Sequence, residues 1–153
     1  MVYDGNWRMK PSIMAALALV LAFVACPQSA PSEKKLLWKP VEFAIVRFND
    51  EAPKSWNLYH QEKRGILLLR LWKRYLLVNV PEQEVYDIDP QTVKPQGDKV
   101  EFSMNDAPSE PLDVSDWKQR DVGSMVRYRF RLSKEGHFLN IEIPLKANGQ
   151  PMY

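Results

Sequence analysis

One apolar run, from Gly65 to Val80, most constrains the fold of this chain. It is the densest apolar run outside the first 26 residues, so any hydrophobic core must be built on it. Read as a helix, the run would place Arg70, Lys73 and Arg74 on one face. We favour two strands joined by a turn at Lys73–Arg74, because glycine and proline bracket the run and its second half is rich in β-favouring residues. The run is too short and too basic to span a membrane.

The clearest strand pattern lies near the C-terminus. From residue 125 to 132, apolar residues alternate strictly with arginines, and residues 133–136 can form a four-residue loop before the next strand. A single register then places the apolar side chains of both strands on one face, which predicts a half-buried antiparallel hairpin. The pairs expected in this register are Leu132–His137, Arg129–Asn140 and Arg127–Glu142.

Shorter strand patterns separated by turn residues fill much of the remaining chain. We expect strands at 41–48, 56–60, 85–89 and 100–104. A helical turn capped by Asp113 or Ser115 is expected within 113–121. The chain has 12 prolines and only 6 glycines, which favours strands joined by proline-marked turns. These patterns predict a mainly β protein with a single antiparallel β-sandwich or small β-barrel domain.

The composition is that of a globular protein, with 45% hydrophobic and 26% charged residues in a chain of 153. This length suits one ordinary domain. The formal net charge is only +2, whereas nucleic-acid-binding proteins usually have a marked basic excess. We therefore expect no nucleic-acid partner. The single cysteine excludes an intrachain disulfide.

The first 25 residues have the features of a secretory signal peptide. Arg8 and Lys10 give a basic start, and residues 13–25 form an unbroken apolar run that is shorter than a membrane span. The run ends at the only cysteine, and Phe23-Val24-Ala25-Cys26 resembles the lipobox of bacterial lipoproteins. The resemblance covers the N-terminus alone. It implies that Cys26 becomes the lipidated first residue of the mature protein; the alternatives are an uncleaved anchor and plain secretion.

The residues after Cys26 are rich in proline and serine and offer almost nothing to bury. We therefore expect a lipidated cysteine and flexible tether over 26–37, followed by a β-rich globular domain over 38–153. The resemblance further implies that the chain resides in the bacterial cell envelope, anchored to a membrane and facing the periplasm or the exterior.

Two features of the expected domain are candidate binding residues. Trp117 stands in a charged stretch, where an exposed indole could stack on a sugar ring. The stripe of Arg127, Arg129 and Arg131 could bind a polyanion, such as lipid headgroups or an acidic glycan. The alternative is that the arginines form a solvated face balanced by Glu142, and that the large aromatic residues belong to the core. The other tryptophans in question are Trp38, Trp56 and Trp72.

No motif predicts a catalytic, cofactor or metal site. Asp87 and Asp89 lie on one side of an expected strand and could share a cation, although such residues more often lead from a strand end into a turn. His60 and His137 have no second histidine or cysteine nearby, which makes a zinc site improbable.

The leading hypothesis is a lipid-anchored envelope protein whose β-rich domain binds or scaffolds another envelope protein or a glycan. One alternative is an envelope hydrolase that works from the 117–121 segment with Asp113 or Asp116. Another is a small-ligand carrier with an apolar cavity inside a barrel. Converging carboxylates in a cleft would favour the hydrolase, and a deep apolar pocket would favour the carrier.

Overall fold

The computed structural model describes residues 35–51, 57–61 and 65–153. These residues belong to one unit, Ser32–Tyr153, and form eleven strands and two short 3-10 helices, which confirms the mainly β fold. The apolar run at 13–25, the lipobox-like residues with Cys26, and Trp56 lie outside the described residues. Among the described residues, no helix is long and apolar enough to cross a bilayer.

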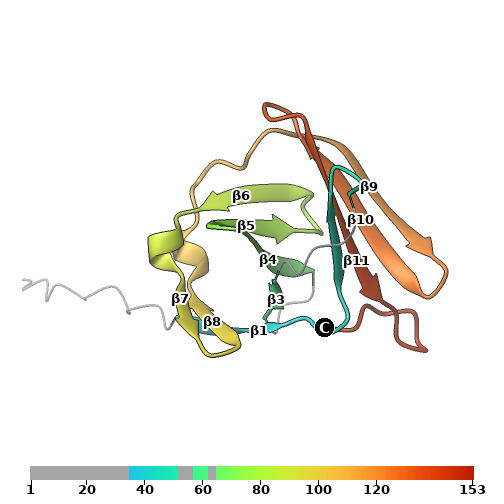
Figure 1. Cartoon of the computed structure of the whole chain (residues 1–153), viewed down its shortest axis with the longest axis horizontal. Helices are drawn as coiled ribbons and strands as arrows, with labels where there is room; N and C mark the ends of the chain where they lie inside the picture. Colours follow the sequence, from blue (N-terminus) through green and yellow to red (C-terminus); the bar gives the residue numbers. More distant parts are fainter. Residues whose placement is uncertain (1–34, 52–56, 62–64) are drawn as a thin grey trace, which may run out of the picture. The chain divides into compact units, whose positions relative to one another are not determined.

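The larger sheet has seven antiparallel strands in the order β6-β5-β4-β3-β1-β8-β7 and curls into a half-barrel (Figure 1). Its strands are β1 (Leu36–Pro40), β3 (Leu58–His60), β4 (Ile66–Leu71), β5 (Arg74–Asn79), β6 (Glu84–Ile88), β7 (Lys94–Gln96) and β8 (Lys99–Phe102). Helix η1 (Pro90–Thr92) connects β6 to β7, and helix η2 (Met104–Asp106) follows β8.

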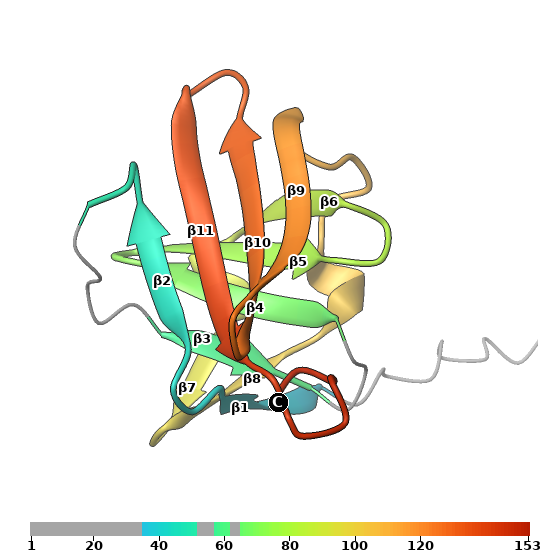
Figure 2. The ribbon, with the colours of Figure 1, turned by 90° about the vertical axis from the view of Figure 1, so that its right-hand side faces the viewer.

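The smaller sheet has four antiparallel strands in the order β2-β11-β10-β9, and its outer face is turned toward the viewer in Figure 2. Its strands are β2 (Ile45–Phe48), β9 (Val114–Val122), β10 (Met125–Leu132) and β11 (His137–Pro144). Its inner face packs against β4 and β5 through a hydrophobic cluster that includes Phe130, Ile141 and Leu69. Two sheets that share an apolar layer in this way form the expected sandwich.

The 65–80 run forms the β4–β5 hairpin and is buried on both faces. Leu67 and Leu69 point into the cluster between the sheets, whereas Leu68 and Leu77 belong to a second cluster inside the curl of the larger sheet. Burial on both faces explains why the run is almost continuously apolar. The turn lies at Trp72–Lys73, one residue earlier than predicted, because Leu71 pairs with Arg74.

The C-terminal hairpin forms in the predicted register. Strands β10 and β11 pair Leu132 with His137, Arg129 with Asn140 and Arg127 with Glu142. The side chains of Val126, Tyr128, Phe130 and Leu132 are all buried, while the arginines between them point to the outer face. Burial raises the pKa of Tyr128 well above its usual range, with a further contribution from its hydrogen bond to Tyr153.

Several predicted segments differ from the structure. The predicted strand at 41–48 is interrupted by a turn in which Phe43 has a φ of 62°, and only Ile45–Phe48 forms β2. Strand β1 begins at Leu36, two residues before the expected start of the globular part. The segment 94–96, for which no strand was expected, pairs with β8 as strand β7.

The predicted helical turn at 113–121 is wrong, because residues 114–121 belong to strand β9, which pairs with β10. The register shifts between Arg129 and Arg131, next to Asp116, whose φ is 55°. This bulge places Val114 and Trp117 on the same inner face although they are three residues apart. A spacing of three is also the spacing of one helix face, so the bulge imitates a helical pattern.

Candidate functional site

The outer face of the four-stranded sheet carries a dense group of basic side chains. Strand β10 contributes Arg127, Arg129 and Arg131, and strand β9 contributes Lys118 and Arg120. We call these five residues the cationic face. Lys118 and Arg120 were not among the predicted site residues, because the helical interpretation of 113–121 gave them no fixed position beside the arginines.

The cationic face places like charges directly opposite one another. Arg120 pairs across the strands with Arg127, and Lys118 pairs with Arg129. The four side chains line a hollow of about 220 Å³. Like charges at directly paired positions repel and destabilise a sheet. A negatively charged group in this hollow would be attracted by all four side chains at once.

Acidic residues balance only part of this charge. Glu142 is buried and lies 2.6 Å from a terminal nitrogen of Arg127 and 4.0 Å from Nε of Arg47. Asp50 lies 3.4 Å from Arg129, and Asp116 lies 3.5 Å from Nε of Arg131. Lys118 and Arg120 are exposed and have no carboxylate partner among the described residues. The predicted balance by Glu142 therefore applies to Arg127 but leaves the β9 side of the face uncompensated.

An aromatic ring on the same face orients two of the arginines. The guanidinium carbons of Arg131 and Arg129 lie 3.9 Å and 4.5 Å from the centre of the Phe138 ring. These cation–π contacts hold the two side chains beside the sheet, and each side chain remains partly exposed.

Trp117, the other predicted binding residue, points to the inner face. Its ring stacks on Phe130 with 5.2 Å between the ring centres and an angle of 14°, and it packs against the cluster between the sheets. Its indole Nε1 is buried and has no hydrogen-bond partner among the described residues. The arginine stripe and Trp117 therefore lie on opposite faces of the sheet and do not form one site.

Two of the remaining tryptophans have contrasting positions. Trp38 is fully buried in the core, as predicted. The core prediction is wrong for Trp72, which is 61% exposed at the β4–β5 turn and forms a T-shaped contact with Phe48, with 5.7 Å between the ring centres.

The residues considered for hydrolysis do not converge. Asp113 and Asp116 are both exposed, and Asp116 is paired with Arg131 on the outer face. The segment 117–121, which the hydrolase hypothesis required as a loop, is part of strand β9.

Asp87 and Asp89, which were considered as metal ligands, form other interactions. Nε of Arg74 donates a hydrogen bond of 2.9 Å to Asp87, and a second Arg74 nitrogen lies 2.8 Å from Glu135. Burial lowers the pKa of Arg74, but these two carboxylates outweigh it and raise the pKa overall. Asp89 caps helix η1 by accepting a hydrogen bond from the backbone N–H of Gln91. No cluster of three or more potential metal ligands occurs in the described part of the chain.

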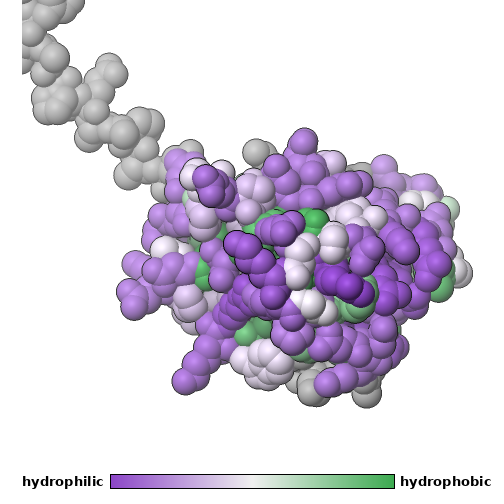
Figure 3. Space-filling model, turned by 90° about the horizontal axis from the view of Figure 1, so that it is seen from above, coloured by the Kyte–Doolittle hydropathy of each residue, from purple (hydrophilic) through white to green (hydrophobic). Residues whose placement is uncertain are grey.

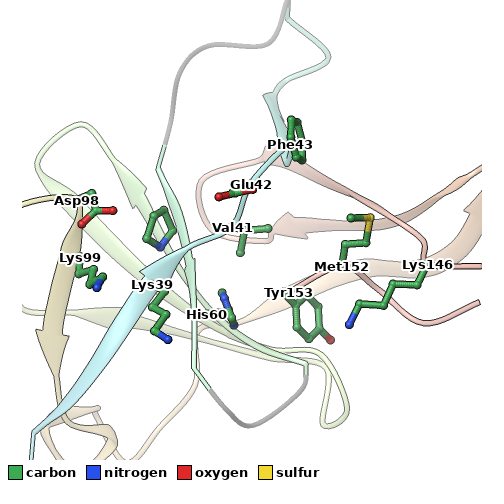
Figure 4. A pocket seen from close by; sticks show the side chains of 11 residues that line it. Lys39, Val41, Glu42, Phe43, His60, Asp98, Lys99, Lys146, Met152 and Tyr153 are labelled. Atoms are coloured by element: carbon green, nitrogen blue, oxygen red, sulfur yellow. The ribbon is translucent and has the colours of Figure 1, made fainter.

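A separate pocket of about 400 Å³ lies where β1, the turn after it and the C-terminal residues meet (Figure 4). The rings of His60 and Tyr153 lie side by side in it, 6.0 Å apart between centres. Sequence reasoning missed this pocket, because its lining comes from segments that are distant in the chain. It is an open surface pocket and not the deep interior cavity that a carrier would need.

Comparison with known proteins gives no relative: no family model matches the chain, and no curated protein and no solved structure matches it significantly.

Proposed function

We propose that this chain is a lipid-anchored protein of the bacterial cell envelope whose β domain binds an anionic polymer through the cationic face. The anchor is supported by the lipobox-like residues 23–26 at the end of an apolar run and by the position of the only cysteine there. The binding role is supported by the chemistry of the outer face of the four-stranded sheet.

The observation that carries the binding proposal is the direct pairing of Arg120 with Arg127 and of Lys118 with Arg129. Each like-charged pair therefore lowers the stability of the sheet. Arrangements that break a local rule of stability are expected mainly where function requires them. An anion in the hollow would attract all four side chains and so offset the repulsion between them.

The chemistry of the face defines the class of partner. Arginine offers a planar set of donors that fits carboxylate and phosphate groups, and lysine adds a point charge. Alternate residues of one strand are about 6.8 Å apart and neighbouring strands about 4.8 Å apart, so the face presents a regular grid of positive charge. An acidic glycan and a layer of anionic lipid headgroups both carry repeated negative groups that suit such a grid.

Binding to immobilised heparin tests the cationic face. We expect the mature chain to be retained at low salt and released as salt rises, because the screening length falls from about 10 Å at ~0.1 M salt to about 3 Å at ~1 M. The formal net charge of the whole chain is only +2, so retention would reflect a local patch. Uncharged dextran is the control resin. Equal retention on dextran, or retention that does not respond to salt, would contradict the proposal.

The anchor is tested by replacing Cys26 with serine. We expect the wild-type mature protein to carry acyl groups on its N-terminal residue, and the Cys26→Ser protein to carry none and to leave the membrane fraction. Mass spectrometry of the N-terminal peptide and membrane fractionation measure the two effects. A wild-type mature protein without acyl groups would show that the leader serves plain secretion or remains as an uncleaved anchor.

A further inference from the structure

One end of the β domain gathers segments that are far apart in the sequence. Strand β1, the turn at 41–44, the β7–β8 turn and the C-terminal residues 145–153 all lie at the bottom in both Figure 1 and Figure 2. The β9–β10 turn joins them, because the N–H of Leu145 donates a hydrogen bond of 2.7 Å to the carbonyl of Ser124. We call this region the lower end.

Most of the exposed large hydrophobic residues lie at the lower end. Six large hydrophobic residues are exposed among those described, and all except Trp72 belong to segments of the lower end. The five are Leu36 at 44%, Leu37 at 40%, Phe43 at 73%, Val122 at 39% and Met152 at 40%. The opposite end, seen from above in Figure 3, is mainly hydrophilic. Apolar surface concentrated at one end of a domain indicates an interaction site.

Phe43 is the most exposed of these residues and has an unfavourable backbone conformation. Its φ of 62° lies in the left-handed region, which a bulky side chain rarely adopts. The ring lies at the edge of the pocket and points away from His60 (Figure 4). A backbone outlier that holds an aromatic ring in solvent suggests that the ring has a role outside the domain.

The polar residues around Phe43 are nearly balanced in charge. Lys39, Lys99 and Lys146 line the same pocket together with Glu42 and Asp98. Lysine side chains can lay their apolar stems along a hydrocarbon surface and keep the ammonium group in the polar layer above it. This surface is therefore suited to the interface of a bilayer, and its attraction does not depend on a large excess of charge.

The chain path brings this end close to a membrane. Cys26 is ten residues before Leu36, where β1 begins, and ten residues can span at most about 35 Å. If Cys26 carries acyl chains, the bilayer remains within that distance of β1. We propose that the lower end docks on the bilayer surface, with Phe43 and Met152 inserted among the headgroups; this inference rests on the proposed lipid anchor.

The proposed docking leaves the cationic face free. Strands β9, β10 and β11 extend between the lower end and the top of the domain in Figure 2, so their outer face lies on the side of the domain and not at its lower end. Lipid headgroups would then contact the lower end, and the cationic face would remain available to an acidic glycan.

A fluorescent probe on the acylated chain tests the docking. Attachment of the lipid to the sulfur of Cys26 blocks the only native thiol, so a cysteine introduced by Met152→Cys or, as a control at the opposite end, Lys134→Cys is the only one that reacts with the label. The labelled protein is placed in vesicles of phosphatidylethanolamine with a minor share of phosphatidylglycerol. We expect the probe at 152 to emit at shorter wavelength and to be quenched by spin-labelled lipids, also at high salt. The probe at 134 should show neither effect.

Two further variants separate docking from folding. Phe43→Asn removes the ring but keeps a residue that tolerates positive φ, so the domain should remain folded while lipid quenching at 152 falls severalfold. Trp72→Asn makes the same change at another exposed aromatic residue, whose φ is 52°, and should leave the quenching unchanged. Equal quenching at 152 and 134 on an acylated chain would overturn the docking and leave the anchor intact. A chain without acyl groups would overturn both.

Discussion

Replacing Trp38 with alanine is expected to lower the free energy of unfolding by about 3–5 kcal/mol. The Trp38 side chain is fully buried, and its Nε1 donates a hydrogen bond of 3.2 Å to the carbonyl of Phe102. Its ring also packs on that of Phe102, with 5.9 Å between the centres. These contacts join β1 to β8, and β1 is the strand that connects the two halves of the larger sheet. Because small domains are stable by only about 5–15 kcal/mol, the variant should be marginally folded.

Urea denaturation monitored by circular dichroism measures this effect. The matched control is Trp72→Ala, which removes the same side chain from an exposed turn and should cost less than about 1 kcal/mol. A similar loss of stability in the two variants would show that Trp38 is not the central core residue described here.

The second large effect is expected for Arg120→Glu, which should weaken polyanion binding and at the same time stabilise the domain. Arg120 is paired with Arg127 across the strands, so the substitution replaces a repulsive pair by an attractive one. The expected gain in stability is about 0.2–1 kcal/mol. Each basic side chain contributes about 1 kcal/mol near a polyanionic surface, and charge reversal changes two units, so affinity for heparin should fall about thirtyfold.

Lys134→Glu is the control for this variant, because it makes the same change in net charge on the exposed β10–β11 loop. Retention on heparin should hardly change in that protein. The loss of affinity in Arg120→Glu should shrink as salt rises, since the charges concerned are exposed. If both variants lose affinity equally, binding depends on overall charge and not on the cationic face.

Several features of the fold could be predicted from sequence because they depend on local alternation. Residues 125–132 place an apolar side chain at every second position, and only one register with the next strand buries all of them on one face. The arginines between them must then share the outer face. The 65–80 run gave an ambiguous pattern, since a strand buried on both faces loses its alternation.

The two residues that strand β9 contributes to the cationic face, Lys118 and Arg120, were not predicted from the sequence. Strand β9 has few apolar residues, and the bulge at Asp116 shifts the positions of Val114 and Trp117 so that they match a helix. What makes this segment a strand is the row of backbone hydrogen bonds that it forms with β10. No local sequence pattern in 113–121 indicates those hydrogen bonds. The pairing of Lys118 and Arg120 with the arginines of β10 could therefore not be predicted.

The sequence by itself determined the mainly β fold and the register of the C-terminal hairpin, because each depends on residues that are neighbours or near neighbours in the chain. Only the tertiary structure decided which basic residues face one another and which apolar residues meet at the lower end. Those surfaces are assembled from strands and turns that lie far apart in sequence, and backbone pairing between them, not side-chain periodicity, brings them together.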